Sequence, residues 1–214
     1  MNEPLVSCIM PTANRQKFIP FALDYFLNQD YINAELVIID DGKESIRPLL
    51  PEDPRIKYFY TEPLGSIGLK RNYACDKAQG EIIIHWDDDE WYAKDWITQQ
   101  VYFLISSGAD LSGIEFVHYY SPVTDTFLIG SAKNRNNPSR PEQWLNGPTL
   151  AYWKTYWEGH PFMDLQKGED DEFVRNPLAK HFAHEYIDGF VKILHPSNTT
   201  IKYFESARHK TIRQ

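Results

Sequence analysis

The sequence predicts an α/β fold, a single domain with a mostly parallel, twisted central sheet flanked by helices. Over about residues 1–107, short apolar runs rich in β-branched residues alternate with segments whose apolar residues recur every three or four positions. This alternation of strands and helices is typical of a parallel sheet. Polar or acidic residues directly follow several of the runs, and parallel sheets bind ligands at the carboxyl ends of their strands. Over about residues 108–214 we expect a smaller, less regular part.

Three strands and two helices are expected before residue 80. The strands are residues 6–10, 35–39 and 56–60, and the helices are residues 18–26 and 65–79. In the first helix the apolar side chains recur at i, i+3, i+4, i+7 and i+8, and Pro20 lies near the first turn, where proline is tolerated. Pro11 ends the first strand, and Gly80 ends the second helix.

The most informative stretch is residues 82–91, where an apolar run leads into four consecutive acids, Asp-Asp-Asp-Glu, with a tryptophan on each side. The run indicates a buried strand. Two carboxylates ~4 Å apart repel each other by on the order of 4 kcal/mol at an effective dielectric constant near 20. A divalent cation held by oxygen ligands would relieve this repulsion. The alternative is a solvated turn that caps the next helix, which is expected from Asp95 to Gly108.

A second group of acids lies in the C-terminal half. Residues 168–175 indicate the acidic start of a helix, and one of these carboxylates could act as a general base. The alternative is simple capping, because acids favour helix N-termini. The other expected features are strands 113–120, 127–131 and 191–194, a loop at 134–141 and an aromatic-rich segment at 149–157.

Composition excludes several classes of protein. The chain has 214 residues, a formal net charge of −8, 42% hydrophobic and 24% charged residues, as expected for one globular core. The acidic balance argues against a nucleic-acid-binding protein, which would carry a basic face. Cys8 and Cys75 are expected as buried thiols in a reducing, cytoplasmic location. The N-terminal residues lack a signal peptide pattern, and no apolar run is long enough to span a membrane. The chain can equally be one domain of a larger protein.

Five short motifs occur in a characteristic order. They are Pro11-Thr12-Ala13-Asn14-Arg15, Asp40-Asp41-Gly42, Gly68-Leu69-Lys70-Arg71-Asn72, Asp87-Asp88-Asp89-Glu90-Trp91 and Gly168-Glu169-Asp170. In this order and strand context, the chain from about Leu5 to Thr200 resembles the family 2 glycosyltransferases of the GT-A fold, which transfer a sugar from a nucleotide-diphosphate donor. The resemblance implies a nucleotide-sugar-binding half, about 1–107, and an acceptor and catalytic-base half, about 108–214.

The resemblance also implies roles for single residues. Those expected to bind the nucleotide sugar are Pro11, Thr12, Ala13, Arg15, Asp40, Asp41, Lys70, Arg71, Asp87 and Asp88. Within the acidic run, Asp88 is expected to face the ribose and Asp89 to bind Mn²⁺ or Mg²⁺, with Asp87 as a supporting metal ligand. Asp170 is expected as the general base, with the adjacent Glu169 and Asp171 as rivals. Ala13 stands where many members carry a tyrosine that stacks on the base.

The reaction implied by the resemblance is metal-dependent and inverting. The donor is expected to be a UDP-sugar, since uridine is the commonest base in the family, and the acceptor a hydroxyl of a glycan, glycoprotein or glycolipid. The alternative function is a non-catalytic nucleotide- or sugar-binding domain of the same fold. No glycine-rich GxGxxG motif follows the first strand, which argues against a Rossmann dehydrogenase or methyltransferase.

Two further sets of residues are candidates with open alternatives. His195 follows the last expected strand and is either a ligand of the metal or the phosphate, or a structural residue. Trp144, Asn146 and Gly147 are candidates for the acceptor side, although Trp144, like Trp153 and Trp157, is individually better explained as part of the core.

Overall fold

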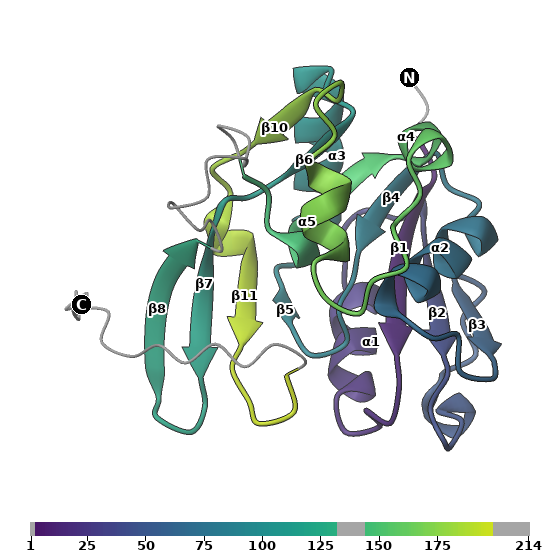
Figure 1. Ribbon diagram of the computed structural model, residues 1–214. Helices are drawn as coiled ribbons and strands as arrows, with labels where there is room; N and C mark the ends of the chain where they lie inside the picture. The colour runs from purple at the N-terminus through teal and green to yellow at the C-terminus, as the bar shows by residue number, and fades with distance from the viewer. Residues whose placement is uncertain (1–2, 132–143, 199–214) are drawn as a thin grey trace.

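The computed structural model describes residues 3–131 and 144–198. Within these residues, one sheet has seven strands in the order β10-β6-β9-β4-β1-β2-β3 (Figure 1). The strands are β1 (Val6–Thr12), β2 (Ala34–Asp40), β3 (Ile56–Tyr60), β4 (Ile82–His85), β6 (Leu111–Gly113), β9 (Ala151–Trp153) and β10 (His181–Ala183). Only β9 runs antiparallel to its neighbours, β4 and β6. The prediction of a mostly parallel central sheet is confirmed.

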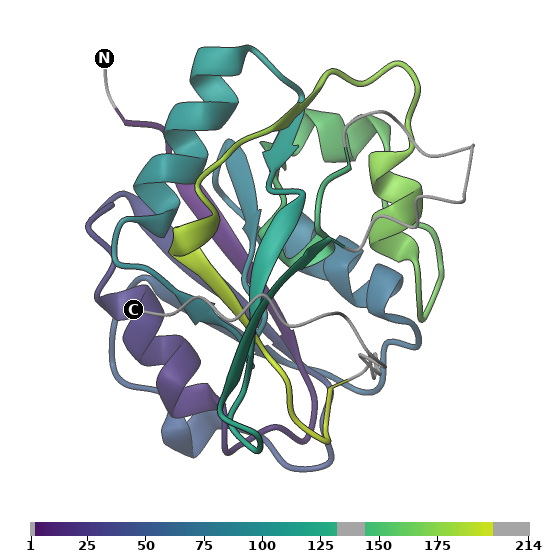
Figure 2. The ribbon, with the colours of Figure 1, turned by 90° about the vertical axis from the view of Figure 1, so that its left-hand side faces the viewer.

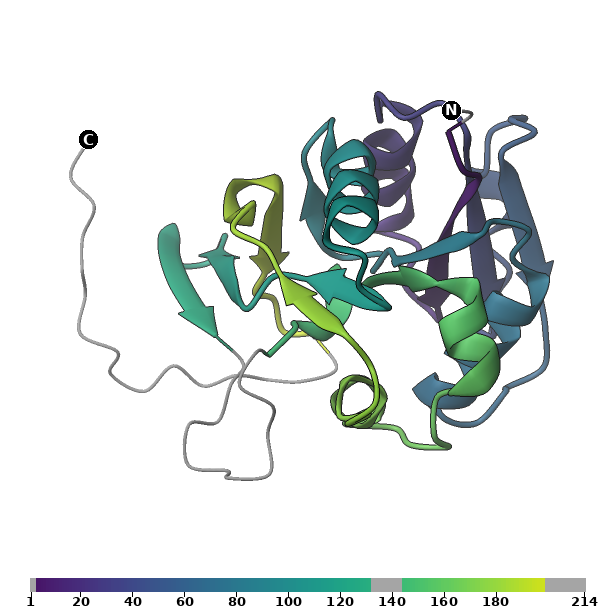
Figure 3. The ribbon, with the colours of Figure 1, turned by 90° about the horizontal axis from the view of Figure 1, so that it is seen from above.

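A second sheet lies beside the main one (Figures 1 and 3). It has four strands in the order β5-β11-β7-β8, which are β5 (Trp91–Tyr92), β11 (Phe190–Ile193), β7 (Phe116–Ser121) and β8 (Thr126–Ser131). The sequence predicted one strand at 113–120, whereas β6 ends at Gly113 and β7 begins at Phe116. The strand is divided because β6 pairs with β9 and β10, while β7 pairs with β8 and β11.

Helices cover both faces of the main sheet, with α1 and α3 on one face and α2 and α5 on the other (Figure 2). They are α1 (Ile19–Leu27), α2 (Ile67–Lys77), α3 (Trp96–Ser107), α4 (Lys154–Gly159) and α5 (Glu169–Val174), together with the short 3₁₀ turns η1 (Arg47–Leu49), η2 (Gly147–Thr149) and η3 (Ile187–Gly189). In β4, Ile82 and Ile84 pack in the core beneath α1 and α3, and Ile83 packs in the core beneath α2 and α5. This alternation explains why the first three residues of β4 are all apolar.

The aromatic-rich segment 149–157 forms β9 and most of α4, which the sequence pattern did not separate. The loop expected at 134–141 lies outside the described residues. So does Thr200, where the family resemblance was expected to end. None of the helices in the described part of the chain is long and apolar enough to cross a membrane.

The turn after β4 is anchored by aromatic packing. Trp86 is buried and stacks on Tyr92 with ring centroids 3.9 Å apart, and its ring also meets Phe26 of α1 edge-on. The Tyr92 hydroxyl lies 2.7 Å from the backbone nitrogen of Asp87, which donates to it. These contacts hold the acidic run at the carboxyl ends of β1 and β4, so its place is set by the core and not by a solvated loop.

Candidate active site

One cavity of about 520 Å³ opens at the carboxyl ends of the central strands. Of the residues expected at a nucleotide-sugar site, those that line it are Pro11, Thr12, Ala13, Arg15, Asp41, Lys70, Arg71, Asp87, Asp88, Asp89, Glu169 and Asp170. The cavity therefore brings the acidic run after β4 and the acidic start of α5 together, although they are some eighty positions apart in the sequence.

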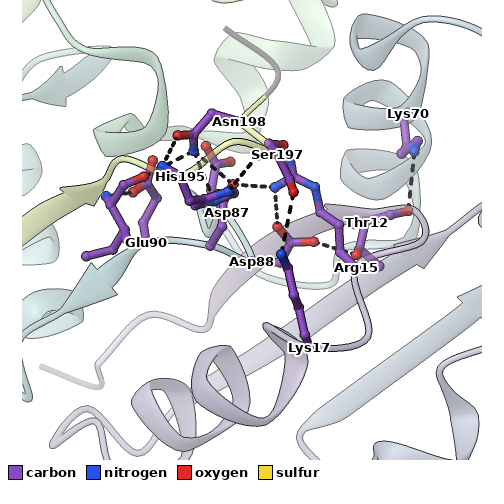
Figure 4. Close-up of polar contacts among 12 residues, drawn as sticks. Thr12, Arg15, Lys17, Lys70, Asp87, Asp88, Glu90, His195, Ser197 and Asn198 are labelled. Carbon is purple, nitrogen blue, oxygen red and sulfur yellow. Dashed lines mark hydrogen bonds and ion pairs between the residues drawn. The ribbon is translucent and has the colours of Figure 1, made fainter. Parts of the chain in front are cut away.

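Asp88 is held by the loop that follows β1 (Figure 4). Thr12 Oγ1 donates to Asp88 Oδ2 at 2.5 Å, and Arg15 Nη1 lies 2.8 Å from Oδ1. Burial raises the pKa of Asp88 to about 6, against the lowering effect of Arg15 and of the Thr12 hydrogen bond. Asp88 and Glu90 are both buried, so the alternative of a solvated acidic turn does not hold.

Asp89 and His195 contact each other at the edge of the cavity. His195 Nε2 lies 3.0 Å from Asp89 Oδ2, and Arg15 also ion-pairs with Asp89. Burial lowers the pKa of His195 although Asp89 raises it, which favours the neutral imidazole that can bind a metal. A carboxylate oxygen and an imidazole nitrogen are suitable donors for Mn²⁺, so these two residues fit such an ion, with phosphate oxygens and water as the other ligands.

Asp87 was expected as a further metal ligand, and in the structure it also contacts a cation of the protein. Within residues 3–131 and 144–198, no three His, Cys, Asp or Glu side chains are grouped closely enough to form a metal site by themselves. A carboxylate oxygen of Asp87 lies 3.6 Å from Arg71 Nη2. The negative charge of Asp87 thus balances the positive charge of the buried Arg71 side chain.

Arg71 lines the cavity and contacts both the acidic run after β4 and the acidic start of α5. Besides Asp87, it contacts Glu169 of α5, with Nε 3.3 Å from Oε1, and His85 Nδ1 lies 2.7 Å from its Nη1. Burial lowers the pKa of Arg71, but the neighbouring carboxylates more than offset this effect, and the guanidinium stays charged. Burial and the charge of Arg71 lower the pKa of His85 well below its usual value, so His85 is neutral.

The two carboxylates at the start of α5 have different surroundings. Glu169 is buried against Arg71, and burial raises its pKa although Arg71 lowers it. Asp170 is partly exposed and lines the cavity. It packs against Gly147, where a Cβ atom would lie 2.6 Å from Asp170 Cγ and closer still to Oδ2. The Gly147 carbonyl oxygen in turn lies 2.7 Å from His85 Nδ1. Glu169 is therefore engaged within the protein, and Asp170 faces the cavity.

On the opposite side of the cavity, Lys70 forms an ion pair with Asp41, and Lys70 Nζ donates to the backbone oxygen of Thr12 at 3.3 Å. Asp40, by contrast, is fully buried and does not line the cavity. Its carboxylate accepts from the backbone nitrogens of Gly42 and Ile46, each at 3.0 Å, and from the Tyr58 hydroxyl at 2.8 Å. The expectation that Asp40 binds the nucleotide is corrected, because both oxygens are used to shape the loop after β2.

The residues expected on the acceptor side are also corrected. Trp144 is buried in the core with Leu145 and Tyr152, so it offers no ring face to a sugar. Asn146 is buried as well, and its amide donates to the backbone oxygen of Glu115 at 3.1 Å. Only Gly147 remains next to the site, because it packs against Asp170.

Lys192 of β11 lines the cavity and was not expected there. The signal was present in the sequence, because a lysine interrupts the apolar strand Phe190–Ile193. Its significance was hidden because the second sheet, which carries β11 to the cavity, could not be derived from the local pattern.

The fold and this cavity define a class of protein, and the comparisons with known proteins agree. A model of the family described as "Glycosyl transferase family 2" matches residues 7–160, and the chain belongs to this family. An uncharacterised glycosyltransferase of Haemophilus influenzae is 36% identical over 112 residues, which are 50% of this chain and 45% of that protein. The putative colanic acid biosynthesis glycosyl transferase WcaA of Escherichia coli is 42% identical over 96 residues, which are 42% of this chain and 34% of that protein. The chain thus spans less than half of the length of these relatives.

Solved structures share the fold at lower identity. S. aureus TarS 1–349 in complex with UDP-GlcNAc has a TM-score of 0.68 at 19% identity, covering 91% of this chain and 60% of that chain. The mannosyltransferase PcManGT from Pyrobaculum calidifontis, in complex with GDP-Man and Mn²⁺, has a TM-score of 0.67 at 17% identity, covering 91% of this chain and 57% of that chain. The GT-A fold expected from the sequence is confirmed.

Proposed function

We propose that this chain is a metal-dependent glycosyltransferase that moves a sugar from a nucleotide-diphosphate donor to an acceptor hydroxyl, with inversion at the anomeric carbon. The observation that carries the proposal is that one cavity is lined both by Asp88 and Asp89, which follow β4, and by Asp170 of α5. Residues before about 108 supply the donor side, and Asp170 from the second half supplies the base. The acceptor belongs to a glycan, glycoprotein or glycolipid.

The nucleotide lies along the loop after β1 and the ion pair of Lys70 with Asp41, and Asp88 receives the ribose. These groups offer carboxylate acceptors and a fixed cation, Lys70, close together in a cavity large enough for a small ligand. Uridine is the proposed base, supported by the family resemblance and by the UDP and UDP-GlcNAc complexes of the TarS neighbours. The GDP-Man complex of PcManGT makes guanosine the first alternative to test.

The proposed metal ligands are Asp89 and His195, and Mn²⁺ is favoured over Mg²⁺ because one donor is an imidazole nitrogen. When bound, the ion would neutralise the charge that develops on the leaving diphosphate. The protein contributes the orientation of both ligands, because Asn198 Nδ2 lies 3.4 Å from Asp89 Oδ2 and 3.1 Å from His195 Nε2.

Asp170 acts as the general base that takes the proton from the acceptor hydroxyl as this attacks the anomeric carbon. A carboxylate within hydrogen-bond reach typically contributes about 10²–10⁴-fold to such a step. Asp170 is chosen over Glu169 because Glu169 is buried and ion-paired with Arg71. Glu169 instead positions α5 on Arg71.

The first experiment is a thermal-shift screen of UDP, GDP and their sugar conjugates with and without Mn²⁺. A ligand that binds only the folded state raises Tm with its concentration, and we expect a Mn²⁺-dependent rise with a uridine or guanosine diphosphate. If no nucleotide raises Tm in the presence of Mn²⁺, the proposed donor site is wrong.

The second experiment separates catalysis from binding. Asp170→Asn should lower release of the nucleoside diphosphate from the best donor by at least about 10²-fold while leaving donor binding unchanged. Asp171→Asn is the matched control, since Asp171 is the next acid of α5 but does not line the cavity. Equal turnover of Asp170→Asn and wild type would exclude Asp170 as the base. A wild-type chain that binds donor without ever turning it over would favour the non-catalytic binding domain.

A further inference from the structure

Lys192 is a cation in the cavity to which the proposed mechanism assigns no role. It lies on β11, next to Tyr119 of β7 in the parallel pairing of the second sheet. Its neighbours on the cavity wall include Asp87, Glu90 and Asp170. The second sheet thus carries a single long basic side chain from β11 to the face of the cavity where the two acidic centres meet.

The ammonium group of Lys192 has three N–H donors. Among the residues that the structure describes, none lies within hydrogen-bond or ion-pair distance of it, although Arg15, Lys70 and Arg71 on the same cavity wall are all paired. The nearby carboxylates already have other partners. Glu90 accepts from the backbone nitrogen of Ile193 at 2.6 Å, and Asp87 faces Arg71.

Lys192 nevertheless keeps its charge at neutral pH. Burial lowers its pKa, but the carboxylates of Glu90, Asp87 and Asp170 raise it by more. Lys192 is only partly exposed. An ammonium group withdrawn from bulk water without a hydrogen-bond acceptor is costly, so its N–H donors need oxygen atoms from water or from a ligand in the cavity.

We propose that Lys192 binds a hydroxyl oxygen of the sugar that the donor carries. This inference rests on the proposed function and extends it to the recognition of the sugar. Lys192 interacts electrostatically with Asp87, which belongs to the donor-binding turn, and with Asp170, the base. The transferred sugar has to lie between these two groups, because its anomeric carbon is attacked by a hydroxyl that Asp170 deprotonates.

A neutral hydroxyl is a better partner for Lys192 than a carboxylate. Asp87 and Asp170 already place negative charge near the ammonium, and a sugar carboxylate would add to it. The structure therefore points to a neutral hexose or deoxyhexose in preference to a hexuronic acid.

The test compares the binding of nucleoside diphosphate alone with that of the matching nucleotide sugar, both with Mn²⁺. In Lys192→Met, the nucleotide sugar should bind about tenfold more weakly, as expected for the loss of one hydrogen bond to a charged group, while the nucleoside diphosphate binds as in wild type. Lys192→Gln, which keeps a hydrogen-bond donor at this position, should lose less affinity for the nucleotide sugar. The control is Lys167→Met, since Lys167 lines the same cavity but is exposed at its rim.

Three outcomes would overturn the inference. The first is an equal affinity of wild type and Lys192→Met for the nucleotide sugar. The second is that both Lys192 variants lose as much affinity for the nucleoside diphosphate as for the nucleotide sugar. The third is that wild type prefers a hexuronic acid donor and that Lys192→Met abolishes this preference. A wild-type chain that binds no nucleotide sugar would instead refute the proposed function, and the inference with it.

Discussion

Replacing Gly147 by alanine should lower kcat by about 10²-fold with little effect on the affinity for the donor. In the structure, an added Cβ would lie 2.6 Å from Asp170 Cγ and 2.9 Å from Asp170 Cβ. Because carbon atoms in contact are normally about 3.5 Å apart or more, the Asp170 side chain has to retreat by about 1 Å. A catalytic group misplaced by ~1 Å can cost about 10²-fold in rate, which corresponds to ~2.7 kcal/mol of transition-state stabilisation. The turn itself cannot move away easily, since the backbone nitrogen of Asn146 donates to the Ile114 oxygen at 2.9 Å and the backbone nitrogen of Leu150 donates to the Gly147 oxygen at 3.3 Å.

The assay is the release of nucleoside diphosphate from the best donor of the thermal-shift screen, with donor affinity measured in parallel. Gly159→Ala is the matched control, because a Cβ at Gly159 would meet nothing within 4 Å. We expect the Gly147 variant to lose about 10²-fold in kcat and to bind the nucleoside diphosphate normally, whereas the control keeps both. Full turnover by Gly147→Ala would show that the carboxylate of Asp170 need not occupy this position, and would refute the argument that Gly147 positions it.

Three further predictions concern groups inside the protein. Arg71→Met should destabilise the fold by about 3–5 kcal/mol in urea denaturation, since it leaves Asp87 and Glu169 without their buried partner; a loss below 1 kcal/mol would contradict this. Asp40→Ala should lower the free energy of unfolding by roughly 3 kcal/mol, because it removes three hydrogen bonds to a buried carboxylate. At a temperature where this variant is folded, it should still bind the nucleoside diphosphate in calorimetry. Burial lowers the pKa of His184 to about 4, so the imidazole binds a proton more readily in the unfolded chain than in the folded one. The free energy of unfolding should therefore fall by up to about 3 kcal/mol as the pH drops from about 6.5 to 4. The comparison is with His184→Gln, which should show a shallower decline over the same pH range, and parallel curves would exclude His184 as the source.

Many residues of the proposed donor side could be placed at the cavity from the sequence, because they follow strands directly. Thr12, Asp41 and Asp88 come at or just after the ends of β1, β2 and β4, and strand ends can be located from apolar runs alone. The same local reasoning was wrong for Asp40, which belongs to the same doublet as Asp41. Asp40 points inward because the backbone nitrogens of Gly42 and Ile46 donate to its carboxylate. The periodicity of apolar residues gives no information about such hydrogen bonds.

The base side was predicted less completely for a different reason. Asp170 was found as part of an acidic helix start, yet nothing in its sequence surroundings indicates Gly147 or Arg71, which lie at a distance along the chain. Trp144 was assigned to the acceptor side because aromatic residues serve both cores and sugar sites, and only burial distinguishes the two roles.

By itself, the sequence determined the alternating α/β pattern, the place of the acidic run after a buried strand, and the family to which the chain belongs. These follow from hydrophobic periodicity and short motifs, which act over a few residues. Only the tertiary structure decided that Arg71 pairs with both acidic centres, that Asp170 packs on Gly147, and that the second sheet brings Lys192 into the cavity. Those contacts join residues distant in the chain, and they depend on how the strands of both sheets pair.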